Sequence, residues 1–546
     1  MDIRRVIRYN KSERETGKNM ENNTYEENEG LSLLKKGQKG LMAAVFSRLG
    51  VIILLFVVQL LIIFAALRWF AQFLPHLFGA SLIMDTLMVP IILNSRLDPT
   101  AKITWLMVIL VMPVFGPLLY AYTRSDVGHR TMRALVRQQT QESRRYIRQN
   151  PQVMQQLERE NPPMAALTRY MRRTGCYPAF DQTDAVYFPL GEEKWKAMIE
   201  ELSRAEKFIF LEYFIIDEGV MWGRVLDILA RKAKQGVEVR LLYDGTNEFS
   251  TLPHSYPAKL RKLGIQCRMF APLMPFLSTH YNYRDHRKIL VIDGHTAFTG
   301  GVNLADEYIN RKEKYGHWKD TAVMLKGEAV RSFTLMFLQM WHTVDRKAQY
   351  DRYLAAPCRA PKEAKGYVIP YGDCPLDEDK VGERVYLDIL NHAQHYVHIM
   401  TPYLILDSEM ENALCYAAQR GVDVRIIMPG VPDKEMPYAL AKTYYPALME
   451  AGVRIYEYTP GFVHAKVFVS DDHTAVVGTI NLDYRSLYHH FECGAYMYKT
   501  ACIADIEADF HQTLKRCTRV TKETLRGEPL RRRIAGPMLK VIAPLL

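Results

Sequence analysis

The feature that most constrains the fold of this chain is an internal repeat of alternating helix and strand patterns. In the first copy an amphipathic segment precedes the apolar stretch FIFLEYFII, and a second helical pattern leads into VEVRLLYD. The second copy repeats this order and ends in VDVRIIMPG. Apolar strands that alternate with helices predict a buried, mainly parallel sheet. We therefore expect an α/β protein with two pseudo-symmetric halves, each a mainly parallel β-sheet flanked by helices, at 186–354 and 367–520, joined by the Pro- and charge-rich linker 355–366.

Each half also carries the same short motif, a histidine and a lysine two residues apart followed by an aspartate. A glycine-led turn that ends in asparagine follows each motif, and the two histidines are as far apart in the sequence as the two asparagines. Two copies in register, each with the same downstream turn, are too specific a pattern to arise by chance. The residues are His286, Lys288, Asp293 and Asn303 in the first copy, and His464, Lys466, Asp471 and Asn481 in the second.

The spacing within the motif points to chemistry on a phosphodiester. A histidine and a lysine at positions i and i+2 of a strand face the same side and can address one ligand. If the halves pack face to face, two ammonium groups and two amides meet and suit the non-bridging oxygens of a phosphodiester. Two imidazoles can then divide the roles of nucleophile and general acid/base. Asp293 and Asp471 precede turn residues, so we expect them to shape hairpins.

Each imidazole also needs a partner that sets its tautomer. Asp320 and Glu492 occupy equivalent places, one predicted strand after each asparagine turn. They are the candidates for orienting the histidines, and the alternative is that both are solvated surface charges. The eight cysteines are scattered without a C-x-x-C pair, which argues against a structural zinc site and a disulfide scaffold.

The apolar residues ahead of the repeat predict a membrane anchor. Leu49 to Leu67 and Ile103 to Tyr122 are uncharged runs, each long enough to cross a bilayer core of about 30 Å. A third apolar stretch between them contains Asp85, which marks either a bundle-facing position or a functional carboxylate. We expect a multi-pass transmembrane anchor of two to three helices at 46–122, after a disordered polar N-terminus at 1–45. The basic flanks leave its orientation open.

The net charge of +11 is distributed in a way that favours a membrane over nucleic acid. Arginines concentrate in a basic helical connector at 123–185, and the C-terminal tail at 521–546 combines basic with apolar residues. Such a tail suits contact with an anionic membrane surface, the alternative being internal packing. No basic groove interleaved with aromatic residues, typical of single-strand binding, is evident, so we expect no nucleic-acid partner.

With these motifs in place, the chain resembles the phospholipase D superfamily and, within it, the bacterial cardiolipin synthases. The likeness covers roughly residues 85–546 and includes both complete histidine and lysine motifs. It rests on N-x-R-D-H-R-K (Asn282 to Lys288), GGVNLADEY, TPYLILD (Thr401 to Asp407), GF-x-H-A-K (Gly461 to Lys466), GTINLDYRS and LDPTAKITWLMVILVMPVFGPLLY.

The resemblance implies a metal-free, cofactor-free, two-step phosphatidyl transfer at the bacterial cell membrane. His286 would attack one phosphatidylglycerol and His464 would act as acid and base, although pseudo-symmetry leaves the two roles interchangeable. The two lysines and two asparagines would hold the phosphate oxygens, and a second phosphatidylglycerol would accept the group to give cardiolipin and glycerol.

Two other functions remain open from the sequence. The same site with water as acceptor would make a phospholipase D-type phosphodiesterase, or a nuclease, which the adjacent anchor disfavours. A non-catalytic membrane scaffold is disfavoured by the two complete motifs. Whether water or lipid accepts the group depends on how well the pocket excludes water.

Overall fold

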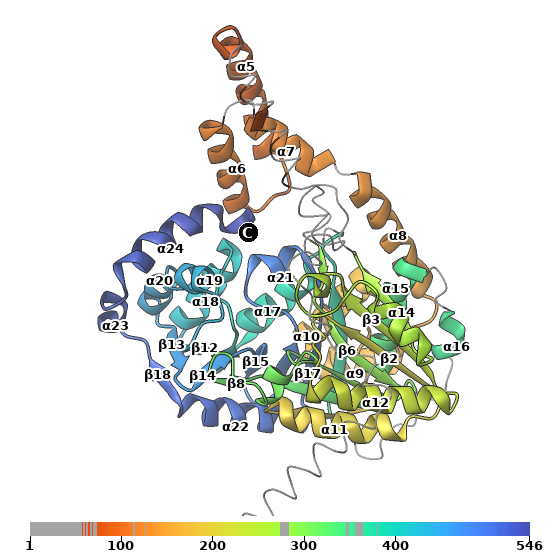
Figure 1. Cartoon of the computed structure of the whole chain (residues 1–546). Helices are drawn as coiled ribbons and strands as arrows, with labels where there is room; N and C mark the ends of the chain where they lie inside the picture. The colour runs from red at the N-terminus through yellow and green to blue at the C-terminus, as the bar shows by residue number, and fades with distance from the viewer. Residues whose placement is uncertain are drawn as a thin grey trace, which may run out of the picture.

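Two β-sheets side by side form the body of the molecule, and a group of helices projects from one end of it (Figure 1). The structure is a computed structural model. It describes residues 74–112, 115–125, 127–272, 283–345, 349–354, 364–377 and 379–545, together with the isolated positions 57, 61, 64, 65 and 68. The expected disordered terminus 1–45, nearly all of the apolar run Leu49 to Leu67 and most of the linker 355–366 therefore lie outside the described residues.

The first sheet has seven strands in the order β1-β9-β7-β6-β2-β3-β4. These strands are β1 (Thr183–Phe188), β2 (Phe208–Tyr213), β3 (Glu238–Asp244), β4 (Gln266–Phe270), β6 (Lys288–Ile292), β7 (Thr296–Gly300) and β9 (Ala322–Gly327).

The second sheet repeats this order as β10-β17-β16-β15-β11-β12-β13 and adds β18 at its edge. Its strands are β10 (Tyr367–Asp373), β11 (Tyr396–Met400), β12 (Asp423–Pro429), β13 (Arg454–Tyr458), β15 (Val467–Ser470), β16 (Thr474–Gly478), β17 (His490–Tyr498) and β18 (Cys517–Arg519). The equivalent strand orders agree with the two pseudo-symmetric halves expected from the repeat.

Both sheets are mixed, so the expectation of mainly parallel sheets was wrong. In the first sheet only the pairs β2–β3 and β3–β4 are parallel, whereas β6, β7, β9 and β1 pair antiparallel. The reason is local: tight turns at Asp293 and Asp471 connect each motif strand to the next, and a hairpin connection forces antiparallel pairing. Within each half, the strands joined through crossover helices are the parallel ones.

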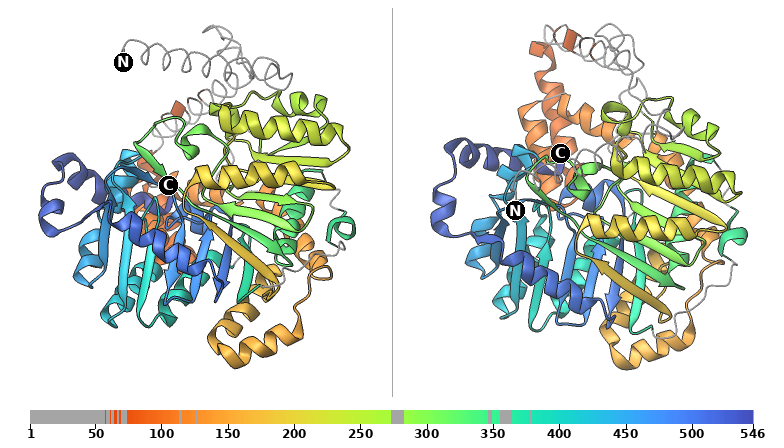
Figure 2. Two further views of the ribbon diagram at one scale, coloured as in Figure 1. Left: turned by 90° about the horizontal axis from the view of Figure 1, so that it is seen from below. Right: turned by 60° about the horizontal axis from the view of Figure 1, so that its bottom comes forward.

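Helices cover the sheets, and the first sheet separates two apolar cores, to which alternate residues of β2 and β6 contribute. One core lies between the first sheet and α11 with α12, and a larger one extends from α10 and α15 through both sheets. Figure 2 shows this layering from two further directions. The helices of the body are α8 (Val127–Ser143), α9 (Pro151–Glu160), α10 (Pro162–Gly175), α11 (Gly191–Arg204), α12 (Val220–Lys234), α13 (Asn247–Ser250), α14 (Tyr256–Lys262), η2 (Asp306–Ile309), α15 (Val330–Asp345), α16 (Tyr350–Leu354), α17 (Val381–His392), α18 (Ser408–Gln419), α19 (Glu435–Ala441), α20 (Tyr445–Glu450), α21 (Tyr484–Tyr488), α22 (Ile503–Leu514), α23 (Lys522–Arg526), α24 (Leu530–Ile542) and η3 (Ala543–Leu545).

The projecting helices are α5 (Leu74–Leu93), α6 (Pro99–Val111) and α7 (Phe115–Ser125). Asp85 lies on α5. The run Ile103 to Tyr122, expected as one span, is divided between α6 and α7. Among the helices that the structure describes, none combines the length and the apolar character needed to cross a membrane.

Candidate active site

At the start of each histidine motif, a short strand of one half pairs with a strand of the other half. Strand β5 (Arg284–Asp285) of the first half pairs in parallel with β17 of the second, and β14 (Gly461–Val463) of the second half pairs in parallel with β8 (His317–Lys319) of the first. The backbone N–H of His286 donates to the carbonyl of Phe491 at 2.9 Å, and that of His464 to the carbonyl of Lys319 at 2.7 Å. Each motif is thus anchored on the opposite half.

Both motif histidines and both turn asparagines line one cavity of about 700 Å³. It lies between the halves, so that His286 and Asn303 come from one half and His464 and Asn481 from the other. The sequence prediction that the two motifs share a site required face-to-face packing of the halves, and this cavity has that geometry.

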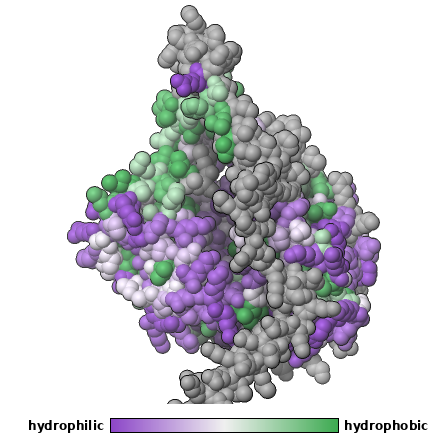
Figure 3. All heavy atoms as spheres, viewed as in Figure 1, coloured by the Kyte–Doolittle hydropathy of each residue, from purple (hydrophilic) through white to green (hydrophobic). Residues whose placement is uncertain are grey.

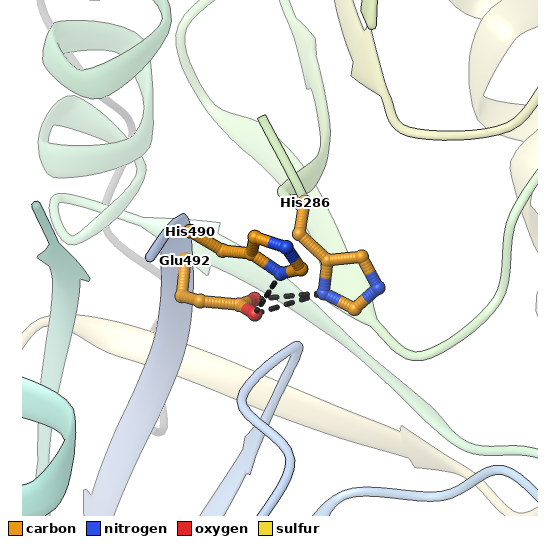
Figure 4. Close-up of side chains that lie close together, drawn as sticks. All are labelled: His286, His490 and Glu492. Carbon is orange, nitrogen blue, oxygen red and sulfur yellow. Dashed lines mark hydrogen bonds and ion pairs between the residues drawn. The ribbon is translucent and has the colours of Figure 1, made fainter. Parts of the chain in front are cut away.

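Each imidazole contacts a carboxylate from the opposite half. His286 Nδ1 lies 2.9 and 3.0 Å from the two carboxylate oxygens of Glu492, and His464 Nδ1 lies 2.7 Å from Asp320 Oδ2. Thr479 Oγ1 also donates to Glu492, at 2.5 Å. Figure 4 shows the His286 ring with Nδ1 toward Glu492. With a proton on Nδ1, Nε2 of each ring keeps its lone pair for a ligand in the cavity.

Burial and nearby cations keep both imidazoles neutral. Burial, followed by the charges of Lys288 and Lys466, holds the pKa of His286 well below its usual value. Burial and Lys466 lower the pKa of His464 to about 4, although Asp320 opposes this shift. A neutral imidazole is the form that can act as a nucleophile.

The motif lysines lie behind the histidines. Lys288 Nζ donates to the carbonyl oxygen of His286 at 2.5 Å, and Lys466 Nζ donates to that of His464. Both side chains are almost fully buried, and burial lowers the pKa of Lys288 to about 8 and that of Lys466 to about 7. Neither is among the residues that line the cavity, so their effect on a ligand there is electrostatic.

The two turn asparagines differ in their bonding. Asn303 accepts from the backbone N–H of Ile215 at 3.0 Å, and its amide nitrogen donates to the hydroxyl of Tyr308 at 2.8 Å. Asn481 Oδ1 is buried without a hydrogen-bond partner in the structure. An amide nitrogen carries two hydrogens, so Asn303 retains one donor for a ligand.

The motif aspartates lie outside the cavity and fix the hairpins. Asp293 accepts three backbone N–H groups at the start of β2, those of residues 206–208, at 2.7 to 2.8 Å. Asp471 makes the same three contacts with residues 394–396 ahead of β11, at 2.7 to 2.9 Å. Both aspartates adopt positive φ angles at the tip of the turn. They fix the ends of strands β6 and β15, which follow the two histidines in the chain, and they are not among the residues that line the cavity.

Sequence reasoning missed His490, which also lines the cavity. Its ring centroid lies 5.4 Å from that of His286, and its Nδ1 lies 3.6 Å from Glu492 Oε1 (Figure 4). The signal was available, because His490 is two residues before Glu492 on β17 and so faces the same side of the strand.

The ligand atoms of His286, His490 and Glu492 lie within 4.8 Å of one another, a spacing compatible with a metal ion. The charges of Lys288 and Lys466 act on the same imidazole and oppose a divalent cation there. A second such group, His398, Glu507 and His511, lies away from the cavity.

Comparison with known proteins agrees with this fold and site. Residues 198–341 and 386–514 match the family model described as "Cardiolipin synthase, PLD-like domain", and residues 83–124 match "Phospholipase D-nuclease N-terminal". Among solved structures, the phosphatidylserine synthase of Haemophilus influenzae Rd KW20 aligns over 71% of this chain and 100% of its own, with a TM-score of 0.54 and 15% identity, which shows a common fold.

Similar chains occur in several bacteria. The cardiolipin synthase of Alkalihalophilus pseudofirmus is 32% identical, covering 84% of this chain and 91% of its own. Cardiolipin synthase 2 of Bacillus anthracis is 34% identical, covering 84% and 88%. An uncharacterised protein of Streptococcus mutans is 56% identical, covering 83% and 98%.

The fold and the paired motifs define the class as the phospholipase D superfamily. Within that class, the chain belongs to the cardiolipin synthase family.

Proposed function

We propose that this enzyme transfers a phosphatidyl group from one phosphatidylglycerol to another, giving cardiolipin and glycerol. The observation that carries the proposal is one cavity lined by two imidazoles, each held through Nδ1 by a carboxylate of the opposite half, which leaves Nε2 of both rings for one ligand. Membership of the cardiolipin synthase family supports phosphatidylglycerol as donor and acceptor.

In the first step His286 Nε2 attacks the phosphorus of the donor lipid. A phosphorus–nitrogen bond forms, the bond from phosphorus to the glycerol oxygen breaks, and His464 gives a proton to that oxygen. His286 suits the nucleophilic role because burial and both lysines hold its pKa well below the usual value, which keeps the ring neutral. His464 suits the acid role because Asp320 favours its protonated form.

In the second step a hydroxyl of the acceptor lipid attacks the phosphatidyl-histidine. The hydroxyl proton moves to His464, the phosphorus–nitrogen bond breaks, and His286 is regenerated, so that the proton given up in the first step is recovered. The anionic phosphodiester raises the pKa of His464 when it binds, which supplies the imidazolium that the first step requires. Lys288 and Lys466 stabilise the charge that develops on the phosphate oxygens.

Hydrolysis is the competing reaction, because water could replace the lipid hydroxyl in the second step. The test is to incubate the purified full-length protein with phosphatidylglycerol vesicles and identify the products. We expect cardiolipin and glycerol in equal amounts. Phosphatidic acid as the only lipid product would instead identify a phospholipase D.

The C-terminal helix supports an enzyme that works at a bilayer surface. Leu530, Ile534 and Met538 recur every four residues along α24 and are 68, 55 and 69% exposed. The opposite face packs on α19, where Gly536 approaches the backbone of Ala439 closely. In Figure 3 the apolar surface over α24 continues onto the projecting helices. Such a surface, adjoining exposed arginines, suits an anionic membrane.

The same helix connects that surface to the cavity. Leu539 lines the cavity, and the carbonyl oxygen of Val541 accepts a hydrogen bond from Thr104 Oγ1 of α6 at 2.6 Å. We propose a multi-pass membrane protein whose helix α24 lies in the bilayer interface beside the entrance for lipid. An interfacial position accounts for the exposed apolar residues Leu530, Ile534 and Met538, which would otherwise contact water.

Replacing Ile534 and Met538 together with glutamate is expected to lower the rate on phosphatidylglycerol vesicles by about tenfold or more, because each loses apolar burial of about 1.5–3 kcal/mol. With the same lipid in detergent micelles the rate should stay within about twofold of the unmodified protein. Val186→Glu, an exposed apolar position on edge strand β1, is the matched control. An unchanged rate on vesicles would argue against interfacial docking of α24.

A further inference from the structure

The cavity wall next to His286 carries two guanidinium groups that the transfer of a single phosphodiester does not use. Arg284 lies on β5 and Arg485 on α21, and both line the cavity. Both are neighbours of His490: Arg284 is paired with His490 in the β5–β17 register, and Arg485 Nε donates to His490 Nε2 at 3.4 Å. Two cationic residues thus lie in the same part of the cavity wall as one imidazole.

His490 links Arg485 to the histidine that would carry the phosphatidyl group. The ring centroids of His490 and His286 are 5.4 Å apart, and Arg485 Nε donates to His490 Nε2. Arg284 precedes His286 by two residues in the chain, and both arginines line the same cavity as His286. The acceptor lipid carries its phosphate close to the reacting atoms, since one glycerol separates its attacking hydroxyl from that phosphate.

The electrostatics favour an anion at this position. Burial, followed by the charge of His286 and opposed by Glu492, lowers the pKa of His490 to about 3, so that this ring is a neutral spacer at neutral pH. Burial lowers the pKa of Arg485, Asp483 opposes this shift, and the charge of Arg284 adds to it, which reflects repulsion between the two guanidinium groups. Asp244 lies 3.7 Å from Arg284, and the carboxylate of Asp483 accepts the backbone N–H of Ser486. A phosphodiester between the guanidinium groups would relieve their repulsion.

We propose that Arg284 and Arg485 bind the phosphodiester of the acceptor phosphatidylglycerol. The inference rests on the proposed function and assigns the second lipid a site of its own in the same cavity. Anchored there, the acceptor presents its terminal glycerol hydroxyl to the phosphorus on His286. Oxygen then bonds to phosphorus, the phosphorus–nitrogen bond breaks, and the hydroxyl proton passes to His464. Water has no charge for the arginine pair to bind, so the pair favours transfer over hydrolysis.

The test compares two acceptors that both attack through a glycerol hydroxyl, of which only one carries a phosphodiester. Cardiolipin formation requires an acceptor with a phosphate, whereas exchange of radiolabelled glycerol into phosphatidylglycerol uses the same donor, the same intermediate and a neutral acceptor. We expect Arg485→Gln and Arg284→Gln each to lower cardiolipin formation by about tenfold or more, because a charge-assisted contact is lost. Glycerol exchange should stay within about twofold, and the ratio of phosphatidic acid to cardiolipin should rise.

Conservative and control variants complete the experiment. Arg485→Lys retains the charge and should recover part of the cardiolipin rate, whereas Arg454→Gln, an exposed position on β13 outside the cavity, should change neither reaction. Equal losses of cardiolipin formation and glycerol exchange, or no loss of either, would overturn the acceptor site. Failure of the unmodified enzyme to make any cardiolipin would instead contradict the proposed function.

Discussion

Replacing either His286 or His464 with alanine is expected to lower cardiolipin formation by about 10³-fold or more, because each ring performs a step that no neighbour can replace. The two variants should differ when the donor carries an activated leaving group, such as p-nitrophenol. That leaving group needs no proton, so His464→Ala should release one equivalent of p-nitrophenol in a burst and retain the lipid on His286. His286→Ala should show no burst. The measurement is rapid-mixing absorbance, with mass spectrometry of the trapped protein.

The outcome decides which histidine is the nucleophile. A burst in His286→Ala and none in His464→Ala would reverse the assignment that the pseudo-symmetry of the halves leaves open. His392→Ala, a half-exposed position on α17, is the control and should behave like the unmodified protein. A chelator should leave the burst unchanged, and inhibition that a divalent cation reverses would contradict a metal-free mechanism.

The repeat predicts that the two motifs share a site, but it does not predict the contacts within that site. Equal spacing of the motifs in two copies of one pattern required a pseudo-twofold relation, and hence a shared site for His286 and His464. The carboxylate partners could be named as candidates, since Asp320 and Glu492 recur at equivalent places. The sequence could not predict that each carboxylate contacts the histidine of the opposite half. This contact follows from the pairing of β5 with β17 and of β14 with β8 across the two halves.

The errors in the fold have local causes. Periodicity identifies buried strands without giving their direction, and the helix–strand repeat alone predicts mainly parallel sheets. The hairpins expected at Asp293 and Asp471 are present, and they make the strands that they connect antiparallel. The repeat could not indicate His490, because the equivalent position in the first half, two residues before Asp320, is Trp318. His490 and its arginine neighbours are therefore a departure from the symmetry of the two halves.

The second large effect on the rate is expected from Glu492 and Asp320, the carboxylates that contact the histidines of the opposite half. Glu492→Gln and Asp320→Asn are each expected to lower the rate of cardiolipin formation by about 10²-fold or more. An amide can donate to Nδ1, which favours the tautomer with the proton on Nε2 and removes the lone pair that faces phosphorus. The exchange of carboxylate for amide changes little in volume, so the fold should be retained, and thermal unfolding measures this directly.

The two substitutions should act on different steps. Glu492→Gln impairs the nucleophile and should abolish the burst from the activated donor, whereas Asp320→Asn impairs the acid and should leave that burst nearly intact. His398 and Glu507 form a chemically similar pair outside the cavity, with Nδ1 and Oε1 2.8 Å apart. Glu507→Gln is therefore the matched control, expected to lower the unfolding temperature and leave the rate within about twofold. If Glu507→Gln lowered the rate as much as Glu492→Gln, the carboxylates would be acting through stability, and the positioning of His286 and His464 by the opposite half would not be part of catalysis.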